Sequence, residues 1–255
     1  MVIDPSISRY KAASVHLVIS AVIAAVILAI MLALWYPPSL FRAMGGMGLI
    51  ALIVGVDVVI GPLITLIIFD TRKKELVFDL MVIGALQVAA LSYGVYAMHA
   101  GRPVFIVIDG QRLAVASAAD LDPEELAKAP HEEFRHLSLT GPRLAAVVPP
   151  EDPQERETLM FAGLTGFGIH QLPKYFVPYA QERSQILVTA RPLGELAPNA
   201  EDARKLEAYL DSTKKDVNQM RDLPVATRHA SVLGIIDGKS GELLEILRIN
   251  PAQSR

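Results

Sequence analysis

Three long apolar runs with short polar segments between them occupy the first hundred residues, and polar and apolar positions are mixed after Met98. The runs lie at about 12–35, 47–69 and 76–98, and each is long enough to cross a bilayer as a helix. A cleaved signal sequence has a shorter apolar core followed by small residues, whereas Tyr36-Pro37-Pro38 follows the first run. The sequence therefore predicts a transmembrane three-helix domain over residues 1–100.

Basic residues at the ends of the runs predict how the chain crosses the membrane. Arg9 and Lys11 precede the first run, and the loop 70–75 between the second and third runs contains Arg72, Lys73 and Lys74. Lysine and arginine near the ends of a span favour the cytoplasmic side. We therefore expect a cytoplasmic N-terminus and, after three crossings, a C-terminal domain in the periplasm. The aromatic residues that support the outer edge of this arrangement are Trp35, Tyr36, Phe41, Tyr93 and Tyr96.

Residues 101–255 are long enough to bury a core of their own. Asp109-Gly110 is a typical hairpin turn between two short strands, at 104–108 and 112–117. Helical patterns follow at 151–164, 173–189 and 200–215, and strands return at 225–229, 232–237 and 243–249. Hairpins at both ends with helices between them predict an α+β fold with an antiparallel sheet.

Small residues recur at every fourth position in the apolar runs. They are Ala21, Ala25, Ala29 and Ala33 in the first run, Ala51 and Gly55 in the second, and Ala90 and Gly94 in the third. Small side chains on one face of a helix allow another helix to approach closely. The stripes serve either the packing of the three helices against each other or the docking of another protein's helix.

Polar residues inside the second and third runs form a candidate partner site. Asp57 lies near the middle of the second run and is followed by Gly61-Pro62, a weak point in a helix. In a helical hairpin centred near Arg72, residues equally distant from Arg72 lie at a similar depth. Asp57 then faces Gln87, with which we predict a hydrogen bond, and Thr65 faces Asp79. Near the loop, Asp79 could instead pair with Lys73 or Lys74, and the Asp57–Gln87 pair is either a structural clamp or a site for a partner helix.

Candidate catalytic chemistry is missing from the sequence. A net charge of −3 gives no basic footprint for nucleic acid, and the absence of cysteine excludes disulfides and thiolate metal sites. The six histidines show no metal-ligand spacing, and no phosphate-binding loop or nucleophile elbow is present. We therefore expect no catalytic residues, no cofactor and no metal, and a protein that is not an enzyme.

Several motifs together resemble the type IV pilin accessory protein family (TfpX/TfpZ). The motifs in the membrane part are Tyr36-Pro37, Leu40-Phe41, Gly45-Gly46, Val56-Asp57, Gly61-Pro62-Leu63, Lys73-Lys74, Asp79-Leu80, Gln87 and Arg102-Pro103. Those after it are Leu172-Pro173-Lys174-Tyr175, Ala190-Arg191-Pro192-Leu193 and Leu223-Pro224-Val225. The resemblance covers essentially the whole chain and defines no catalytic residues.

The resemblance implies an inner-membrane chaperone of a Gram-negative bacterium that stabilises a type IV pilin and promotes pilus assembly. The pilin would be bound through its transmembrane helix and its periplasmic head, at the small-residue faces that include Ala25, Ala51 and Gly55. Two other classes stay open. One is a small transporter subunit with an ion pathway along Asp57, Thr65, Asp79 and Gln87, and the other is a membrane-anchored periplasmic sensor.

Overall fold

The computed structural model describes residues 7–110, 112–164, 167–196, 198–226 and 232–250. The chain forms two compact units. Unit 1 consists of residues up to Leu34 together with Gly45–Ala100, and unit 2 consists of Trp35–Met44 and the residues from Gly101 onward. The segment 35–44, which the sequence analysis placed in the membrane domain, therefore packs with the second unit.

Unit 1 contains three helical rods that are long and apolar enough to cross a membrane. The first is α1 (Arg9–Leu34), and the third is α5 (Leu76–Ala100). The second rod, Gly46–Ile68, is built from α3 (Gly46–Ile53), the π-helix η1 (Val54–Ile60) and α4 (Gly61–Ile68). These bounds agree with the three predicted spans to within a few residues.

A π-helical segment interrupts the middle of the second rod. The amide of Gly61 donates to the carbonyl of Val56, five residues back instead of four. Proline at position 62 has no amide hydrogen and cannot continue an ordinary helical ladder. Because π-helical turns are rare and often occur at functional sites, this segment makes the region around Asp57 a candidate functional site.

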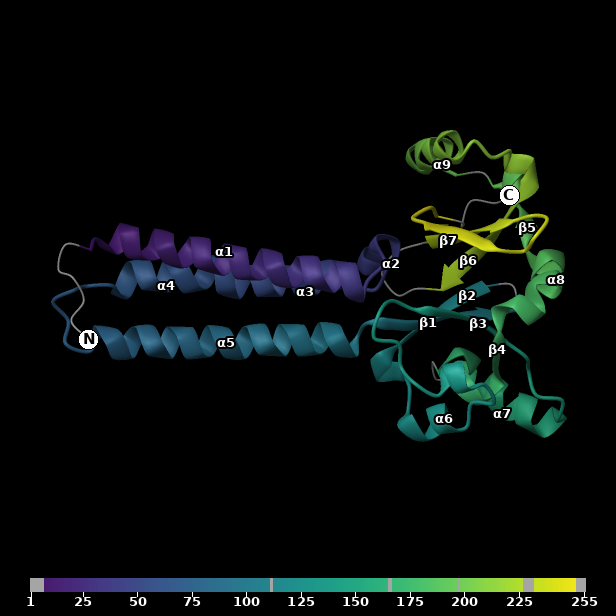
Figure 1. Ribbon diagram of the computed structural model, residues 1–255, viewed down its shortest axis with the longest axis horizontal. Coiled ribbons are helices and arrows are strands. Elements are labelled where there is room, and N and C mark those ends of the chain that lie inside the picture. The colour runs from purple at the N-terminus through teal and green to yellow at the C-terminus, as the bar shows by residue number, and fades with distance from the viewer. Residues whose placement is uncertain (1–6, 111, 165–166, 197, 227–231, 251–255) are drawn as a thin grey trace. The chain divides into compact units, whose positions relative to one another are not determined.

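The second rod lies between the other two and contacts both. Helix α1 packs against η1 and α4, whereas α5 packs against α3 and α4 (Figure 1). Gly94 of α5 allows one of these close approaches, because a Cβ there would lie 2.7 Å from Cγ1 of Ile53. Gly94 of the third span thus serves packing within the chain.

Unit 2 is built on one mixed sheet of eight strands. Seven strands follow the order β4-β3-β1-β2-β6-β7-β8, and β5 pairs with β6. The strands are β1 (Pro103–Asp109), β2 (Arg112–Ser117), β3 (Arg143–Val147), β4 (Phe176–Pro178), β5 (Arg191–Pro192), β6 (Met220–Ala226), β7 (Val232–Asp237) and β8 (Leu243–Leu247). The helices are α6 (Pro123–Ala127), α7 (Pro153–Leu164), α8 (Tyr179–Thr189) and α9 (Ala200–Thr213).

The prediction of a purely antiparallel sheet is wrong. The two predicted hairpins form, as β1–β2 and β7–β8, but β1 runs parallel to β3 and β2 runs parallel to β6. A turn motif shows that neighbouring strands reverse, whereas a strand that returns after a long crossover can pair in either direction. The segment between β2 and β3 is such a crossover, and α6 lies in it. The predicted helix at 173–189 begins at Tyr179, because Phe176–Pro178 pairs with β3 as a strand.

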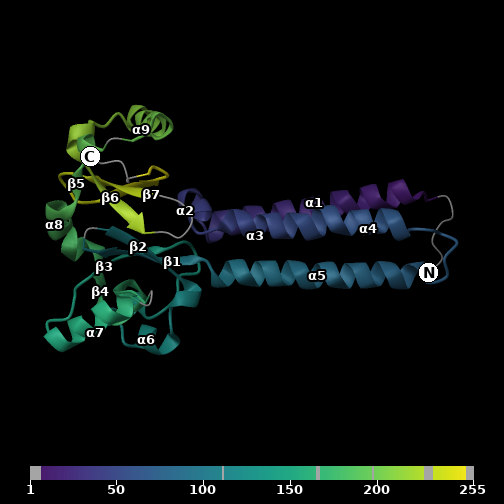
Figure 2. The same cartoon turned by 180° about the vertical axis from the view of Figure 1, so that it is seen from behind.

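Alternating residues of the sheet bury two different apolar layers. Figure 2 shows α9 on one side of the sheet and α6 and α7 on the other. In β1, Ile106 and Ile108 pack with residues of α8, while Phe105 and Val107 face a cluster that contains Phe134 and Phe176. The rings of Phe105, Phe134 and Phe176 contact each other edge to face. A third cluster packs α9 against β7 through Leu206 and Leu233.

The short helix α2 (Pro38–Ala43) belongs to the first of these layers. Leu40 and Ala43 are fully buried in the cluster that also contains Leu113, Val232 and Ile246. Tyr36 and Phe41 are buried as well, with their ring centroids 5.5 Å apart. These two aromatic residues, which the sequence places at the outer membrane edge, are thus buried in the segment 35–44 that packs with unit 2.

Candidate functional site

A chain of hydrogen bonds joins all three rods through His16. Its Nδ1 lies 2.7 Å from the hydroxyl of Thr65 in α4, and its Nε2 lies 2.8 Å from Oε1 of Gln87 in α5. Because Oε1 can only accept, Nε2 of His16 donates this second bond. Thr65 also donates to the carbonyl of Gly61 at 3.1 Å. His16 therefore fixes α1 to both neighbouring rods.

Gln87 satisfies a carbonyl that the π-helix leaves without its usual donor. In the register set by the Gly61–Val56 bond, the carbonyl of Asp57 would accept from residue 62, which is a proline without an amide hydrogen. Nε2 of Gln87 donates to this carbonyl at 3.1 Å. Gly61 makes room for the amide, because a Cβ at this position would lie 2.0 Å from Nε2.

Asp57 and Gln87 meet at the same depth, as predicted, but the hydrogen bond between them does not involve the predicted side-chain atoms of Asp57. Gln87 reaches Asp57, but it binds the backbone carbonyl instead of the carboxylate. The side chain of Asp57 is buried, with the residue 5% exposed, and both carboxylate oxygens have no hydrogen-bond partner among the described residues. Such a carboxylate is costly inside a membrane segment.

Asp79 lies in the first turn of α5, next to the 70–75 loop that joins the second and third rods. It forms an ion pair with Lys73 of the 70–75 loop, one of the two partners that the sequence analysis named. The hydrogen bond with Asp79 raises the pKa of Lys73 above its ordinary value. Thr65, which the depth argument placed opposite Asp79, bonds to His16 instead. Among the described residues, no three histidine, aspartate or glutamate side chains come together as a metal site.

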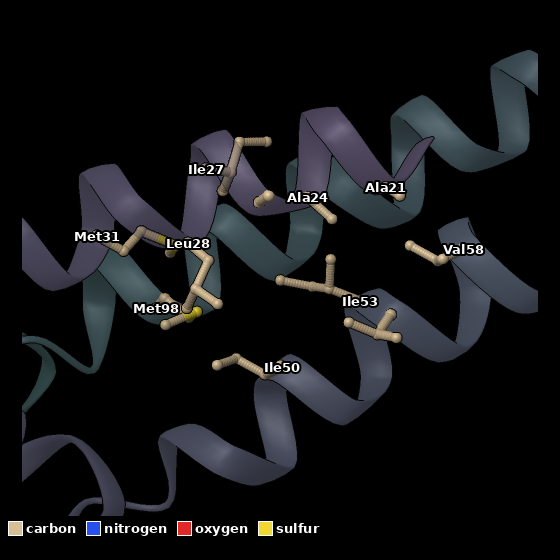
Figure 3. A pocket seen from close by; sticks show the side chains of 11 residues that line it. Ala21, Ala24, Ile27, Leu28, Met31, Ile50, Ile53, Val58 and Met98 are labelled. Carbon is tan, nitrogen blue, oxygen red and sulfur yellow. The ribbon is translucent and has the colours of Figure 1, made fainter. Parts of the chain in front are cut away.

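The half of unit 1 away from the 70–75 loop is apolar and contains an open groove between α1 and α3. Figure 3 shows the side chains that surround it, with Met98 of α5 at its base. The groove has a volume of about 270 Å³. Its walls are Ala21, Ala24, Ala25, Ile27, Leu28 and Met31 of α1, and Ile50, Ile53, Val54 and Val58 of α3 and η1.

The small-residue stripe of the first span is not covered by the other helices of unit 1. Ala21, Ala25, Ala29 and Ala33 are all exposed, and the first two line the groove. Ala51 is exposed too, and a Cβ at Gly55 would meet no atom within 4 Å. These positions are therefore not used for packing within the chain, unlike Gly94.

Sequence reasoning missed His16 as part of the site. Equal depth in a hairpin relates only the second and third spans, so it predicts no partner for a residue of the first span. The signal was present, since a histidine inside an apolar run is rare and is a candidate functional residue.

Comparison with known proteins gives matches along the chain. Residues 5–45 match the family model of the fimbrial assembly protein FimB. The fimbrial assembly protein of Dichelobacter nodosus serogroup I is 30% identical over 94% of this chain and 95% of its own length. That of serogroup E1 is 28% identical over the same shares, and that of serogroups C1 and C2 is 33% identical over 47% of this chain and 92% of its own length. No solved structure matches.

Proposed function

The chain belongs to the family of fimbrial assembly proteins, and from this premise we propose that it is a membrane chaperone that holds a type IV pilin subunit before pilus assembly. Membership of this family indicates a role in pilus assembly. The relatives match both units, which supports a function that uses the membrane helices and the sheet domain together. In this proposal the helices bind the transmembrane helix of the pilin, and unit 2 contacts its head.

The groove between α1 and α3 is the observation that carries the proposal. Helices that only needed to pack together would turn their small residues toward each other, because small residues permit close contact. Here Ala21 and Ala25 are exposed and line an apolar groove instead. A pilin before assembly is expected to be a single apolar helix with a folded head, and its helix needs an apolar surface of this kind inside the membrane.

We place unit 2 in the periplasm of a Gram-negative cell, with the protein in the inner membrane. The basic 70–75 loop supports this orientation. Residues 35–44 and the residues after 101 share one core, so both must lie on the same side. Two spans separate them, and two crossings return a chain to the side from which it started.

Photo-cross-linking in cells tests the proposal. The photoreactive amino acid p-benzoylphenylalanine replaces a large residue that already lines the groove, Leu28 or Ile50, and Leu86 of α5 as a control. Leu86 is 66% exposed and does not line the groove. We expect pilin to be captured from positions 28 and 50 and much less from position 86. Equal capture from all three positions, or no capture from the groove, would refute the proposal.

Filling the groove tests the same surface without a probe. Ala25→Leu adds bulk to the wall of the groove, whereas Ala85→Leu adds the same atoms to an exposed face of α5. We expect the first variant to reduce surface pili and the second to leave them unchanged, with both proteins at normal abundance. Normal piliation in the Ala25→Leu strain would show that the groove does not hold the subunit.

A further inference from the structure

The carboxylate of Asp57 has no use within the chain. Both of its oxygens are buried and have no hydrogen-bond partner among the described residues, although polar side chains of α1 and α5 lie nearby. Asp57 lines a cavity of about 170 Å³ between α1, η1 and α5, together with His16, Ser20 and Gln87. The remaining walls of the cavity are apolar or glycine: Ile19, Ile23, Ala24, Gly84, Val88 and Leu91.

The donors of Gln87, His16 and Thr65 are already engaged, and the hydroxyl of Ser20, which also lines the cavity, forms no hydrogen bond with the carboxylate. The amide of Gln87 donates to the backbone carbonyl of Asp57, and Nε2 of His16 donates to Gln87. The hydroxyl of Thr65 bonds to the carbonyl of Gly61 and faces Nδ1 of His16. Turning any of these three engaged donors toward the carboxylate would break a bond of the cluster that joins the three rods.

The membrane itself offers no donor at this depth. Asp57 is the central residue of the second rod, eleven residues from Gly46 and eleven from Ile68. With a rise of about 1.5 Å per residue, both ends of the rod are about 16 Å away. That distance is about half the hydrocarbon thickness of a bilayer, so lipid headgroups and water lie out of reach.

We propose that the Asp57 carboxylate binds a hydrogen-bond donor, a hydroxyl, amide or ammonium group, in the middle of the transmembrane helix of the bound subunit. The inference rests on the proposed function and adds the contact that recognises the subunit. Ala24 lines both the Asp57 cavity and the apolar groove between α1 and α3, so the two spaces adjoin at one residue of α1. The groove would accept the apolar face of the helix, and Asp57 would select a helix with a polar group at its centre.

A donor on a helix fits the site better than a lipid or a metal ion. Acyl chains have no donor, and no group of three acidic or histidine ligands surrounds the carboxylate in the described part of the chain. Inside a membrane, a buried acceptor and a buried donor that meet relieve the cost of both. The pairing would therefore add selectivity to a groove that otherwise recognises only shape.

The test compares variants of Asp57 in the full-length protein, with p-benzoylphenylalanine at position 50 as the reporter of bound pilin. Asp57→Leu removes both acceptor oxygens, and we expect capture of pilin to fall by at least about tenfold. Asp57→Asn keeps one acceptor oxygen, and we expect a smaller loss. The control is Val59→Leu, at an exposed position of the same rod that lines neither the groove nor the cavity. Val59→Leu should leave capture unchanged.

The same assay on the pilin side identifies the donor. Each polar residue in the pilin's transmembrane helix is replaced by leucine, and one replacement should weaken capture by the wild-type protein but cause no further loss with Asp57→Leu. Unchanged capture by Asp57→Leu, or by Asp57→Asn if the leucine variant does not accumulate, would overturn the inference while leaving the proposed function intact. If the wild-type protein captures no pilin, the proposed function itself fails, and this inference fails with it.

Discussion

Alanine at position 61 would place a methyl carbon 2.0 Å from Nε2 and 2.6 Å from Cδ of Gln87. The backbone of Gly61 is helical, with φ −59° and ψ −55°, so alanine fits the backbone and clashes only with the neighbouring side chain. Gln87 has to leave its position, and it then loses its bonds to the carbonyl of Asp57 and to His16. The variant thus tests whether these bonds hold the three rods together.

The stability of Gly61→Ala changes through two opposing contributions, the lost hydrogen bonds and the higher helix propensity of alanine. Hydrogen bonds between membrane helices contribute about 0.6 kcal/mol each on average and up to about 1.7 kcal/mol, so two lost bonds cost about 1–3 kcal/mol. Alanine is a better helix former than glycine by about 1 kcal/mol. Gly48 of α3 provides the matched control, because a Cβ there meets no atom within 4 Å. We expect Gly61→Ala to be less stable than Gly48→Ala by about 2 kcal/mol.

Unfolding of the purified full-length protein in mixed micelles, followed by circular dichroism as the SDS fraction rises, measures these differences. A double-mutant cycle with Gln87→Ala assigns the cost to the right contact. In the Gln87→Ala background the clash is gone, and Gly61→Ala should no longer cost more than Gly48→Ala. Equal stability of Gly61→Ala and Gly48→Ala in the presence of Gln87 would refute the reasoning.

Three further changes test other parts of the molecule. His16→Leu removes both bonds that fix α1, and in the same SDS titration it should lower stability by about 1–2 kcal/mol, whereas the exposed Ser14→Leu should not. Leu40→Ala should lower the free energy of unfolding of unit 2 by about 2–5 kcal/mol, seen as faster proteolysis after residue 101, while the exposed Arg42→Ala leaves it unchanged. The backbone amides of Ser240 and Lys239 lower the pKa of Asp237 from 3.8 to about 2, so its charged form stabilises unit 2 above about pH 4. That contribution, about 1 kcal/mol after solvent screening, is lost as the pH falls toward 2 and should be absent in Asp237→Ala, as thermal unfolding at pH 7 and pH 2.5 would show.

The membrane spans and the depth of the polar residues could be predicted because both depend on simple periodic geometry. Span length follows from bilayer thickness, and a hairpin places Asp57 and Gln87 at one depth whatever their side chains do. The atoms that bond could not be predicted in the same way. They depend on the π-helical register at Val54–Ile60, which frees the carbonyl of Asp57 and for which the sequence shows only Gly61-Pro62 as a sign.

Other features depend on contacts between distant parts of the chain. Leu40 and Phe41 are apolar residues in what looks like a loop, and nothing near them in sequence shows that their partners lie more than sixty residues later. Strand direction at β1–β3 and β2–β6 is likewise set by crossovers and not by local turns. The exposure of Ala25 and Ala29 could not be predicted, because a stripe of small residues has the same spacing whether a helix of the same chain or another protein covers it.

The place of α2 in the core of unit 2 has a consequence for biosynthesis. Leu40 and Ala43 leave the ribosome early, but the strands that bury them are made only after the second and third spans. If only one of the two spans in 46–100 inserts, α2 and the later strands lie on opposite faces of the membrane, and the core cannot close. A folded sheet domain therefore requires that the two spans cross as a pair, so a quality-control protease that removes unfolded domains would also remove molecules in which a single span has failed to insert.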